Sequence, residues 1–189
     1  MELHLPKTAR IIIIEGITGS GKDTVQGLLK GKLRNKVVYD YSEGEMLFSW
    51  KHVQIPGISK MRLELMNGFV DYMAKKILEE PDAVFVLNRF HVSAYMAHVS
   101  KDRSLGKNYG TIVKKLQKLP VHILFLKPPA HEVEKRASHS ERAEAWKRYQ
   151  KMMMEKEGFT NRKDMYLSQQ KLMMNALKRD GLPFSVVET

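Results

Sequence analysis

The stretch Gly16-Ile17-Thr18-Gly19-Ser20-Gly21-Lys22-Asp23-Thr24 stands between a run of four isoleucines and a segment of helical composition. Backbone amides can converge on a phosphate only where no side chain blocks their approach, and the glycines remove that obstruction. The lysine can reach the β- and γ-phosphates of a nucleoside triphosphate, and the N-terminus of the next helix adds amide donors and partial positive charge. The stretch therefore predicts a phosphate-binding loop that takes ATP.

One position of this loop departs from the usual pattern. Asp23 replaces the Ser or Thr whose hydroxyl normally binds magnesium. The hydroxyl of Thr24 comes one residue later and should point elsewhere, towards the α-phosphate. An aspartate can hold Mg²⁺ directly or through water, and it would repel a phosphate if no metal were present. We therefore expect strict dependence on Mg²⁺, with Asp23 as the metal-binding residue.

Strand-like and helix-like segments alternate along the rest of the chain. Strands are predicted at residues 10–15, 37–41, 83–87, 121–126 and 184–187, and helices at 22–34, 59–80, 91–100, from 128, from 138, and at 161–179. This alternation predicts a parallel sheet covered by helices on both faces. The expected fold class is α/β, a doubly wound five-stranded parallel sheet of the P-loop NTPase type, with residues 1–189 forming a single domain.

Composition excludes several classes of protein. The 189 residues include no cysteine, which rules out disulfides, thiolate metal sites and thiol catalysis and is compatible with a cytoplasmic protein. Apolar runs such as the four isoleucines are too short to span a membrane. The histidines show no metal-ligand spacing, so no zinc site is expected. The net charge of +11 is spread along the chain, which favours a phosphate pocket over a nucleic-acid surface.

The segment Asn88-Arg89-Phe90-His91-Val92-Ser93 follows the third predicted strand, at the edge of the sheet where ligands bind. It resembles the Asp-Arg-Tyr/Phe-x-x-Ser segment of thymidylate kinases and the Glu-Arg-Ser-x-x-Ser segment of deoxynucleoside kinases. The arginine of those families contacts substrate phosphates, so the resemblance implies that Arg89 clamps a phosphate and that Ser93 belongs to the substrate site. Asn88 stands where those families have an acid, and Asp23 is the residue that could compensate for the missing charge.

The resemblance implies further site residues. Nucleotide kinases have a lid whose arginines close over the transferring phosphate, which here corresponds to residues 135–150 with Arg136, Arg142 and Arg148 in that order of preference. Thymidylate kinases have a substrate-binding arginine at the position of Asn67, and Arg62 on the same predicted helix is a candidate phosphate ligand. Both residues are therefore expected in the substrate site.

The loop after the second predicted strand supplies an alternative. Glu45 and Trp50 are separated as in the Glu-Pro-Val-x-x-Trp segment of deoxynucleoside kinases, whose glutamate activates a sugar hydroxyl. A hydroxyl acceptor needs such a base, whereas a phosphate acceptor is already anionic. Glu45 as base would thus define a deoxynucleoside kinase, with Trp50 in its substrate site.

Taken together, the residues and the resemblance imply an ATP-dependent phosphotransferase of nucleotide biosynthesis. It would transfer the γ-phosphoryl group of Mg-ATP to a (deoxy)nucleoside monophosphate. More distant alternatives are a kinase of polynucleotide ends, favoured by the basic charge, and a non-catalytic nucleotide-binding protein, favoured by Asn88. Trp146, Tyr149 and Met152–Met154 are interpreted as core or interface packing, and an exposed methionine face there would indicate a homodimer.

Overall fold

The computed structural model describes residues 3, 5–42, 45, 55–138 and 144–189. A single parallel sheet forms its centre, with the strand order β2-β3-β1-β4-β5. The strands are β1 (Ile11–Gly16), β2 (Val37–Tyr41), β3 (Ala83–Asn88), β4 (Val121–Lys127) and β5 (Phe184–Glu188). The five-stranded parallel α/β fold predicted from the sequence is confirmed.

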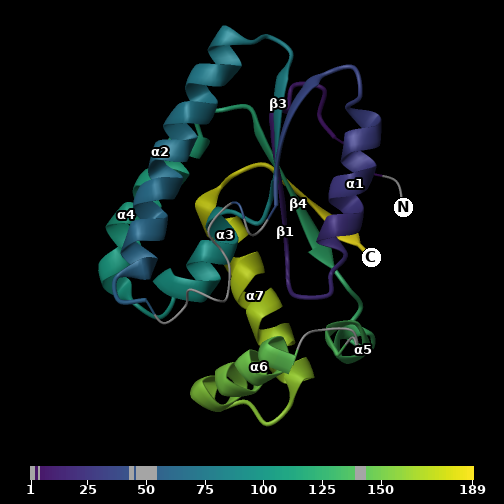
Figure 1. Ribbon diagram of the computed structural model, residues 1–189, viewed down its shortest axis with the longest axis vertical. Helices are drawn as coiled ribbons and strands as arrows, with labels where there is room; N and C mark the ends of the chain where they lie inside the picture. The colour runs from purple at the N-terminus through teal and green to yellow at the C-terminus, as the bar shows by residue number, and fades with distance from the viewer. Residues whose placement is uncertain (1–2, 4, 43–44, 46–54, 139–143) are drawn as a thin grey trace.

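Helices cover both faces of the sheet. They are α1 (Lys22–Lys32), α2 (Ile58–Glu79), α3 (His91–Ala94), the π-helix η2 (Tyr95–Val99), the short 3₁₀-helix η3 (Arg103–Leu105), α4 (Gly106–Leu116), α5 (Val133–Ala137), α6 (Glu144–Glu157) and α7 (Arg162–Asp180). Figure 1 shows α1 on one side of the sheet and α2, α3 and α4 on the other, with α5 and α6 beyond the carboxyl ends of the strands. In the described ranges, no helix combines the length and the apolarity that crossing a membrane requires.

The isoleucine run explains why the first strand lies at the centre. Successive side chains of a strand point to opposite faces, so Ile11 and Ile13 pack with the layer of α2, α4 and α7, while Ile12 and Ile14 pack with α1. All four side chains are at most 1% exposed. A strand that is apolar on both faces must be covered on both faces, and this requirement places the phosphate loop at the middle of the sheet edge.

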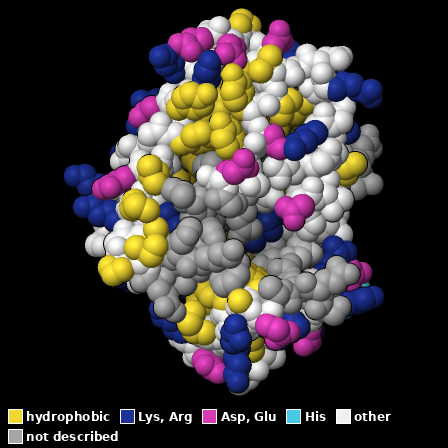
Figure 2. All heavy atoms as spheres, in the orientation of Figure 1, with side chains coloured by type: hydrophobic (Ala, Val, Ile, Leu, Met, Phe, Trp, Pro, Cys, Tyr) yellow, Lys and Arg dark blue, Asp and Glu magenta, His cyan; other side chains and the backbone are white. Residues whose placement is uncertain are grey.

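The side facing the viewer in Figure 2 carries a mixed surface. Hydrophobic side chains gather over the upper part of α2 and the adjacent edge of the sheet, where Val37, Tyr72 and Leu78 are exposed. Tyr39 and Phe85 stack beneath with ring centroids 4.8 Å apart. Lys and Arg side chains on this side are interspersed with Asp and Glu, in keeping with the spread of basic residues along the chain.

Three helix predictions differ from the structure. The prediction of a helix that starts at Pro128 is wrong, because α5 begins only at Val133. A residue that precedes a proline rarely adopts the helical backbone conformation, and Pro128 precedes a second proline. The helix α4 was not predicted, since its two glycines weaken the helical signal. The helix predicted for residues 91–100 is divided into α3 and η2. The start of the helix predicted from residue 138 falls mostly outside the described residues, and α6 is described from Glu144.

Candidate active site

The phosphate loop connects β1 to α1 and depends on glycine at two points. Gly21 caps α1 with φ 84°, a left-handed conformation that glycine adopts without strain. A Cβ atom on Gly19 would lie 2.8 Å from the backbone oxygen of Arg136, too close for any side chain. The Nζ atom of Lys22 donates to the backbone oxygens of Gly16 (3.2 Å) and Ile17 (2.9 Å). The ammonium group therefore lies against the loop that a polyphosphate would occupy.

A chain of amides joins the loop to the neighbouring strands. The Nδ2 atom of Asn88 donates to Asp23 Oδ1 (2.6 Å) and to Gln26 Oε1 (2.9 Å). The Nε2 atom of Gln26 in turn donates to Asp40 Oδ1 and to the backbone oxygen of Tyr41. These directions fix the orientation of both amides. They leave Asn88 Oδ1 as a buried acceptor with no hydrogen-bond partner among the described residues.

This arrangement fits a magnesium ion. The Asp23 carboxylate and the Asn88 amide are bonded to each other, and carboxylate and amide oxygens are ligands that hard divalent cations accept. No three His, Asp or Glu side chains in the described part of the chain could jointly hold a metal. Mg²⁺ bound to a nucleotide commonly takes one or two carboxylates and completes its shell with phosphates and water. Asp23 and Asn88 are therefore the residues that would hold such an ion.

A buried glutamate that the sequence analysis did not single out positions the Arg89 segment. Glu15 is fully buried, and its Oε1 accepts from the backbone amides of Phe90 (2.9 Å), Val92 (3.1 Å) and Ser93 (3.2 Å), while Oε2 accepts from the Ser93 hydroxyl. Burial raises the pKa of Glu15, and the hydrogen bonds from Ser93 and Phe90 and the charge of Arg89 oppose that effect. A charged residue at the end of an apolar strand is the signal that could have revealed it.

Arg89 has the only positive φ of any non-glycine residue in the described ranges, 71°. Its Nη1 atom donates to the backbone oxygen of Gly16 (3.3 Å) and lies 3.5 Å from the Ser93 hydroxyl. The left-handed conformation costs a residue with a Cβ atom about 1–2 kcal/mol, and such strain often occurs at functional sites. The strained backbone directs the guanidinium group back towards the phosphate loop.

This strain can be measured with two substitutions of Arg89. Both Arg89→Ala and Arg89→Gly remove the guanidinium group, but only glycine accepts the positive φ without strain. We expect the glycine variant to unfold in urea with a free energy about 1 kcal/mol greater than that of the alanine variant. Equal stabilities would show that the backbone at this position is relaxed.

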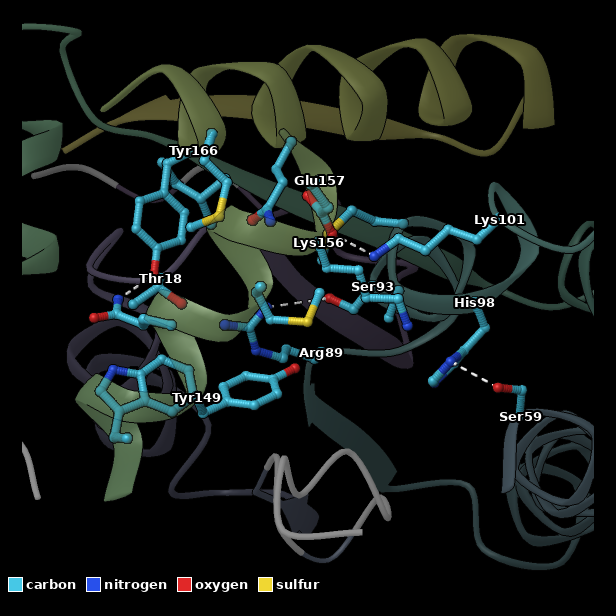
Figure 3. Close-up of a pocket in the computed structure, with 18 of the residues that line it drawn as sticks. Thr18, Ser59, Arg89, Ser93, His98, Lys101, Tyr149, Lys156, Glu157 and Tyr166 are labelled. Carbon is cyan, nitrogen blue, oxygen red and sulfur yellow. Dashed lines mark hydrogen bonds and ion pairs between the residues drawn. The ribbon is translucent and has the colours of Figure 1, made fainter. Parts of the chain in front are cut away.

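A cavity of about 310 Å³ opens beside the loop, within the size range of small-molecule sites. Ile17 and Thr18 of the loop form one wall, and α2, η2, α6 and α7 form the others (Figure 3). Its lining combines the cations Arg62, Arg89, Lys101 and Lys156, the amides Gln150 and Gln169, and a group of aromatic and methionine side chains. Cationic, amide and aromatic groups in one cavity suit a ligand that has both an anionic group and a flat ring.

The structure brings together several residues predicted from the sequence. Arg62, Arg89 and Ser93 line the cavity together with Ile17 and Thr18. Arg62 is 4% exposed, and its Nη1 atom lies 3.0 Å from His98 Nε2. The two arginines thus reach one cavity from α2 and from the end of β3. Their roles in binding remain predictions.

Other predicted residues lie elsewhere. Asn67 is half-buried on α2 and does not line the cavity. The guanidinium group of Arg136 bonds to Glu132 (2.6 Å) and to the backbone oxygen of Thr189 (2.8 Å), so a role in a lid requires it to leave these partners. Arg148 is exposed on α6. Arg142 and Trp50 lie outside the described residues.

Glu45 also lies away from the cavity lining. Its carboxylate accepts from the backbone amide and the hydroxyl of Ser42, both at 2.6 Å. The side-chain and backbone hydrogen bonds from Ser42 lower the pKa of Glu45. A carboxylate with a lowered pKa is a weaker base, which weighs against activation of a hydroxyl group by this residue.

The cavity includes residues that were interpreted as packing. Trp146, Tyr149 and Met153 of α6 line it, and their spacing places them on one helical face. The spacing of Trp146, Tyr149 and Met153 is the sequence signal that could have indicated a helix face turned towards a ligand. Met152 and Met154 are half-buried, so the exposed methionine face that would have indicated a homodimer is not formed.

Burial of His91 and His98 should make stability depend on pH. Burial is the main cause that lowers the pKa of His98 to about 4 and that of His91 to about 3. Because the unfolded value is about 6.5, the unfolded chain binds more protons between these values and stability falls as the pH falls. Each histidine contributes up to about 1.4 kcal/mol per pH unit.

The free energy of unfolding in urea should therefore decrease between about pH 7 and pH 5, and His91→Leu should remove about half of the slope that His91 and His98 contribute together. An identical slope in this variant would contradict the assignment of His91 as a neutral buried side chain.

The glycine-rich loop after the central strand, the Asn-Arg segment at the end of β3 and the helices over the cavity are arranged on a fold that is seen in solved structures. The fold is that of thymidylate kinase-like P-loop kinases. The structure is similar to thymidylate kinase from Ehrlichia chaffeensis (TM-score 0.58, 13% identity, 95% of this chain and 87% of that chain). It is likewise similar to thymidylate kinase from Candida albicans (TM-score 0.56, 13% identity, covering 95% of this chain and 83% of that chain).

A third similar structure is the YorR protein from Bacillus subtilis in complex with phosphorylated GDP (TM-score 0.55, 17% identity, 94% of this chain and 85% of that chain). No protein-family model and no curated protein sequence matches the chain. The likeness at these identities establishes the fold, and the reaction must be argued from the site.

Proposed function

We propose that this protein is a kinase that transfers the γ-phosphoryl group of Mg-ATP to a (deoxy)nucleoside monophosphate. One observation carries the proposal: the phosphate loop is also a wall of the cavity, through Ile17 and Thr18. Arg89 joins the two, because it lines the cavity and donates to the backbone oxygen of Gly16 in the loop. A donor phosphate on the loop and an acceptor in the cavity would therefore meet at this wall.

The residues at this junction have distinct tasks. Lys22 would leave its loop carbonyls to contact the β- and γ-phosphates, and Arg89 would hold the acceptor phosphate in line with them. Phosphoryl transfer depends mainly on positioning and on stabilising the charge of the transferring group. Asp23 and Asn88 would hold Mg²⁺, which supplies further charge neutralisation when bound. The helices α6 and α7 cover the cavity and limit access of water, which would otherwise compete as acceptor.

The lining of the cavity favours a monophosphate acceptor. Arg62 and Arg89 can bind a phosphate and other acceptor atoms, while Trp146 and Tyr149 offer ring surfaces for stacking with a base. A monophosphate oxygen is already anionic and needs no base, in keeping with the low pKa of Glu45. Two of the similar structures are thymidylate kinases and a third holds phosphorylated GDP, which supports a nucleotide as substrate.

Product identification tests the proposal. The protein is incubated with Mg-ATP and a panel of nucleosides, nucleoside monophosphates and oligonucleotides, and the products are separated by chromatography. We expect a nucleoside diphosphate to form, and Glu45→Gln to reduce its formation by less than about threefold, since Glu45 lies outside the cavity lining. A phosphorylated nucleoside that disappears in Glu45→Gln would instead establish the deoxynucleoside kinase reaction. ADP formation that is the same with and without every acceptor would contradict both.

A further inference from the structure

One stretch of the chain is basic without any acidic residue. Residues 103–118 include five of the 32 Lys and Arg residues and none of the 21 Asp and Glu residues. The stretch comprises η3, α4 and the two residues that follow α4. Four of its cationic side chains are exposed and form what we call the α4 stripe: Arg103, Lys107, Lys114 and Lys118. None of them lines the cavity beside the phosphate loop, so the proposed reaction does not account for this charge.

The side chains of the α4 stripe lie in a row. Lys107 and Lys114 are two turns apart on α4, on one face with the exposed Thr111 between them. Arg103 comes four residues before Lys107, and Lys118 comes four residues after Lys114, so the row continues by one turn at each end. A helical rise of about 1.5 Å per residue makes the row about 20 Å long. Because α4 packs beside α2 (Figure 1), the α4 stripe is a line of positive charge on the outer side of this helical layer.

The charge of the α4 stripe is not compensated by acidic side chains. In the described ranges, no Asp or Glu forms an ion pair with any of its four members. Three acids that border the stripe are bonded to other groups: Asp71 to Lys115 (2.7 Å), Asp180 to Arg179 (2.8 Å) and Asp102 to the amide of Ser104 (2.9 Å). A row of like charges holds counterions, and their release when a polyanion binds is a driving force for association.

A second cavity, of about 280 Å³, opens along the neighbouring face of α4. Gly106, Gly110 and Gln117 line it, and each stands one position before a residue of the row, so the cavity lies alongside the α4 stripe. Arg179 of α7 also lines it, with its Cζ atom 4.2 Å from the centroid of the Tyr95 ring. The Arg179 side chain is still 48% exposed. Its planar guanidinium group therefore offers a flat surface on which a base can stack.

These two features together match a single strand of nucleic acid. Proteins bind single strands through cations that follow the phosphates and flat side chains that stack with bases. A membrane surface would require exposed apolar side chains, and in the described residues no large exposed hydrophobic side chain lies on α4. We propose that the α4 stripe and the second cavity bind single-stranded nucleic acid, with phosphates on the stripe and a base in the cavity. This site is separate from the one that the proposed function uses.

Binding of a labelled strand in the absence of ATP tests the proposal. Fluorescence anisotropy measures the affinity for an oligothymidylate of about 20 nucleotides at several salt concentrations. Four phosphate contacts predict that log K falls with log[salt] with a slope of about −3, so affinity should fall about 50-fold between about 50 mM and about 200 mM salt. A duplex of the same length, phosphatidylserine vesicles and polyglutamate should bind more weakly. Tighter binding of any of these three, or no binding of the strand, would overturn the proposal.

A triple variant tests the α4 stripe itself. Lys107→Gln, Lys114→Gln and Lys118→Gln together should reduce the slope to about −0.7, so that affinity changes only about threefold over the same salt range. The matched control replaces by glutamine three exposed lysines that are paired with acids: Lys36 with Asp82, Lys60 with Glu64 and Lys75 with Glu79. This control lowers the net charge by the same amount and should keep the slope of the wild type. Equal slopes in the two triple variants would show that net charge alone attracts the strand, which would overturn the proposal.

Two further measurements locate the strand. Arg179→Lys keeps the charge but loses the planar group, so affinity should fall at least about fivefold with the salt slope unchanged. Unaltered affinity at the melting temperature of the wild type would overturn the place of a base in the second cavity. Excess ATP should not displace the strand, and kcat of the stripe variant should stay within about threefold of the wild type. Displacement by ATP would locate the strand at the phosphate loop and overturn the inference, whereas strand binding without any kinase activity would contradict the proposed function alone.

Discussion

Replacing Lys22 with alanine should lower kcat for phosphoryl transfer by about 10²–10³-fold, the usual cost of removing one group that stabilises transition-state charge. Lys22 is 7% exposed, and its ammonium group donates to two carbonyls of the loop. Steady-state kinetics with saturating Mg-ATP and the best acceptor measure this loss.

The matched control lies at the other end of the same helix. Lys32 donates to the backbone oxygen of Leu3 and does not approach the cavity, so Lys32→Ala should retain activity within about threefold. If kcat of Lys22→Ala were close to that of Lys32→Ala, the phosphate loop would take no part in the reaction.

The second large effect concerns the pair Asp23 and Asn88. Asp23→Asn removes the carboxylate that accepts from the Asn88 amide, and we expect kcat to fall by at least about 10²-fold, because a bound metal contributes several kcal/mol. The affinity for Mn²⁺ in the presence of ATP, measured by electron paramagnetic resonance, should fall in parallel. This readout does not depend on turnover.

An exchange variant provides the control for this pair. In Asp23→Thr combined with Asn88→Asp, the carboxylate moves from the loop to the strand end, and the two side chains remain neighbours. We expect Mn²⁺ affinity in the exchange variant to recover to within about tenfold of the wild type, whereas Asp23→Thr alone should remain defective. If the single and the exchange variant lost Mn²⁺ affinity to the same extent, Asp23 would not act as a ligand of the metal ion.

The parts of the fold that follow from local patterns could be predicted from the sequence. The isoleucines at 11–14 define a strand that is buried on both faces, and the glycines after it leave few conformations other than a phosphate loop. Asn161 caps α7 with its side chain, as the predicted helix boundary requires. A parallel sheet with helices on both faces then follows from the alternation of strands and helices.

The cavity could not be predicted in the same way, because its walls come from distant segments. Residues 146–153 meet the phosphate loop only through tertiary packing, and their aromatic and methionine composition is equally typical of a core. The place of His98 depends on a π-turn, for which the sequence has no clear signal. Arg136 carries the expected charge, but its side chain bonds to Glu132 and to the end of β5 instead.

In the proposed reaction, donor and acceptor phosphates meet where the loop and the cavity share a wall. An analogue in which adenosine and the best acceptor nucleoside are joined by five phosphates would span both sites. We expect it to bind at least about 10²-fold more tightly than ATP or the monophosphate alone and to exclude both, because one molecule would make both sets of contacts. Binding no tighter than ATP, together with unaltered binding of the monophosphate in its presence, would show that the two sites are separate.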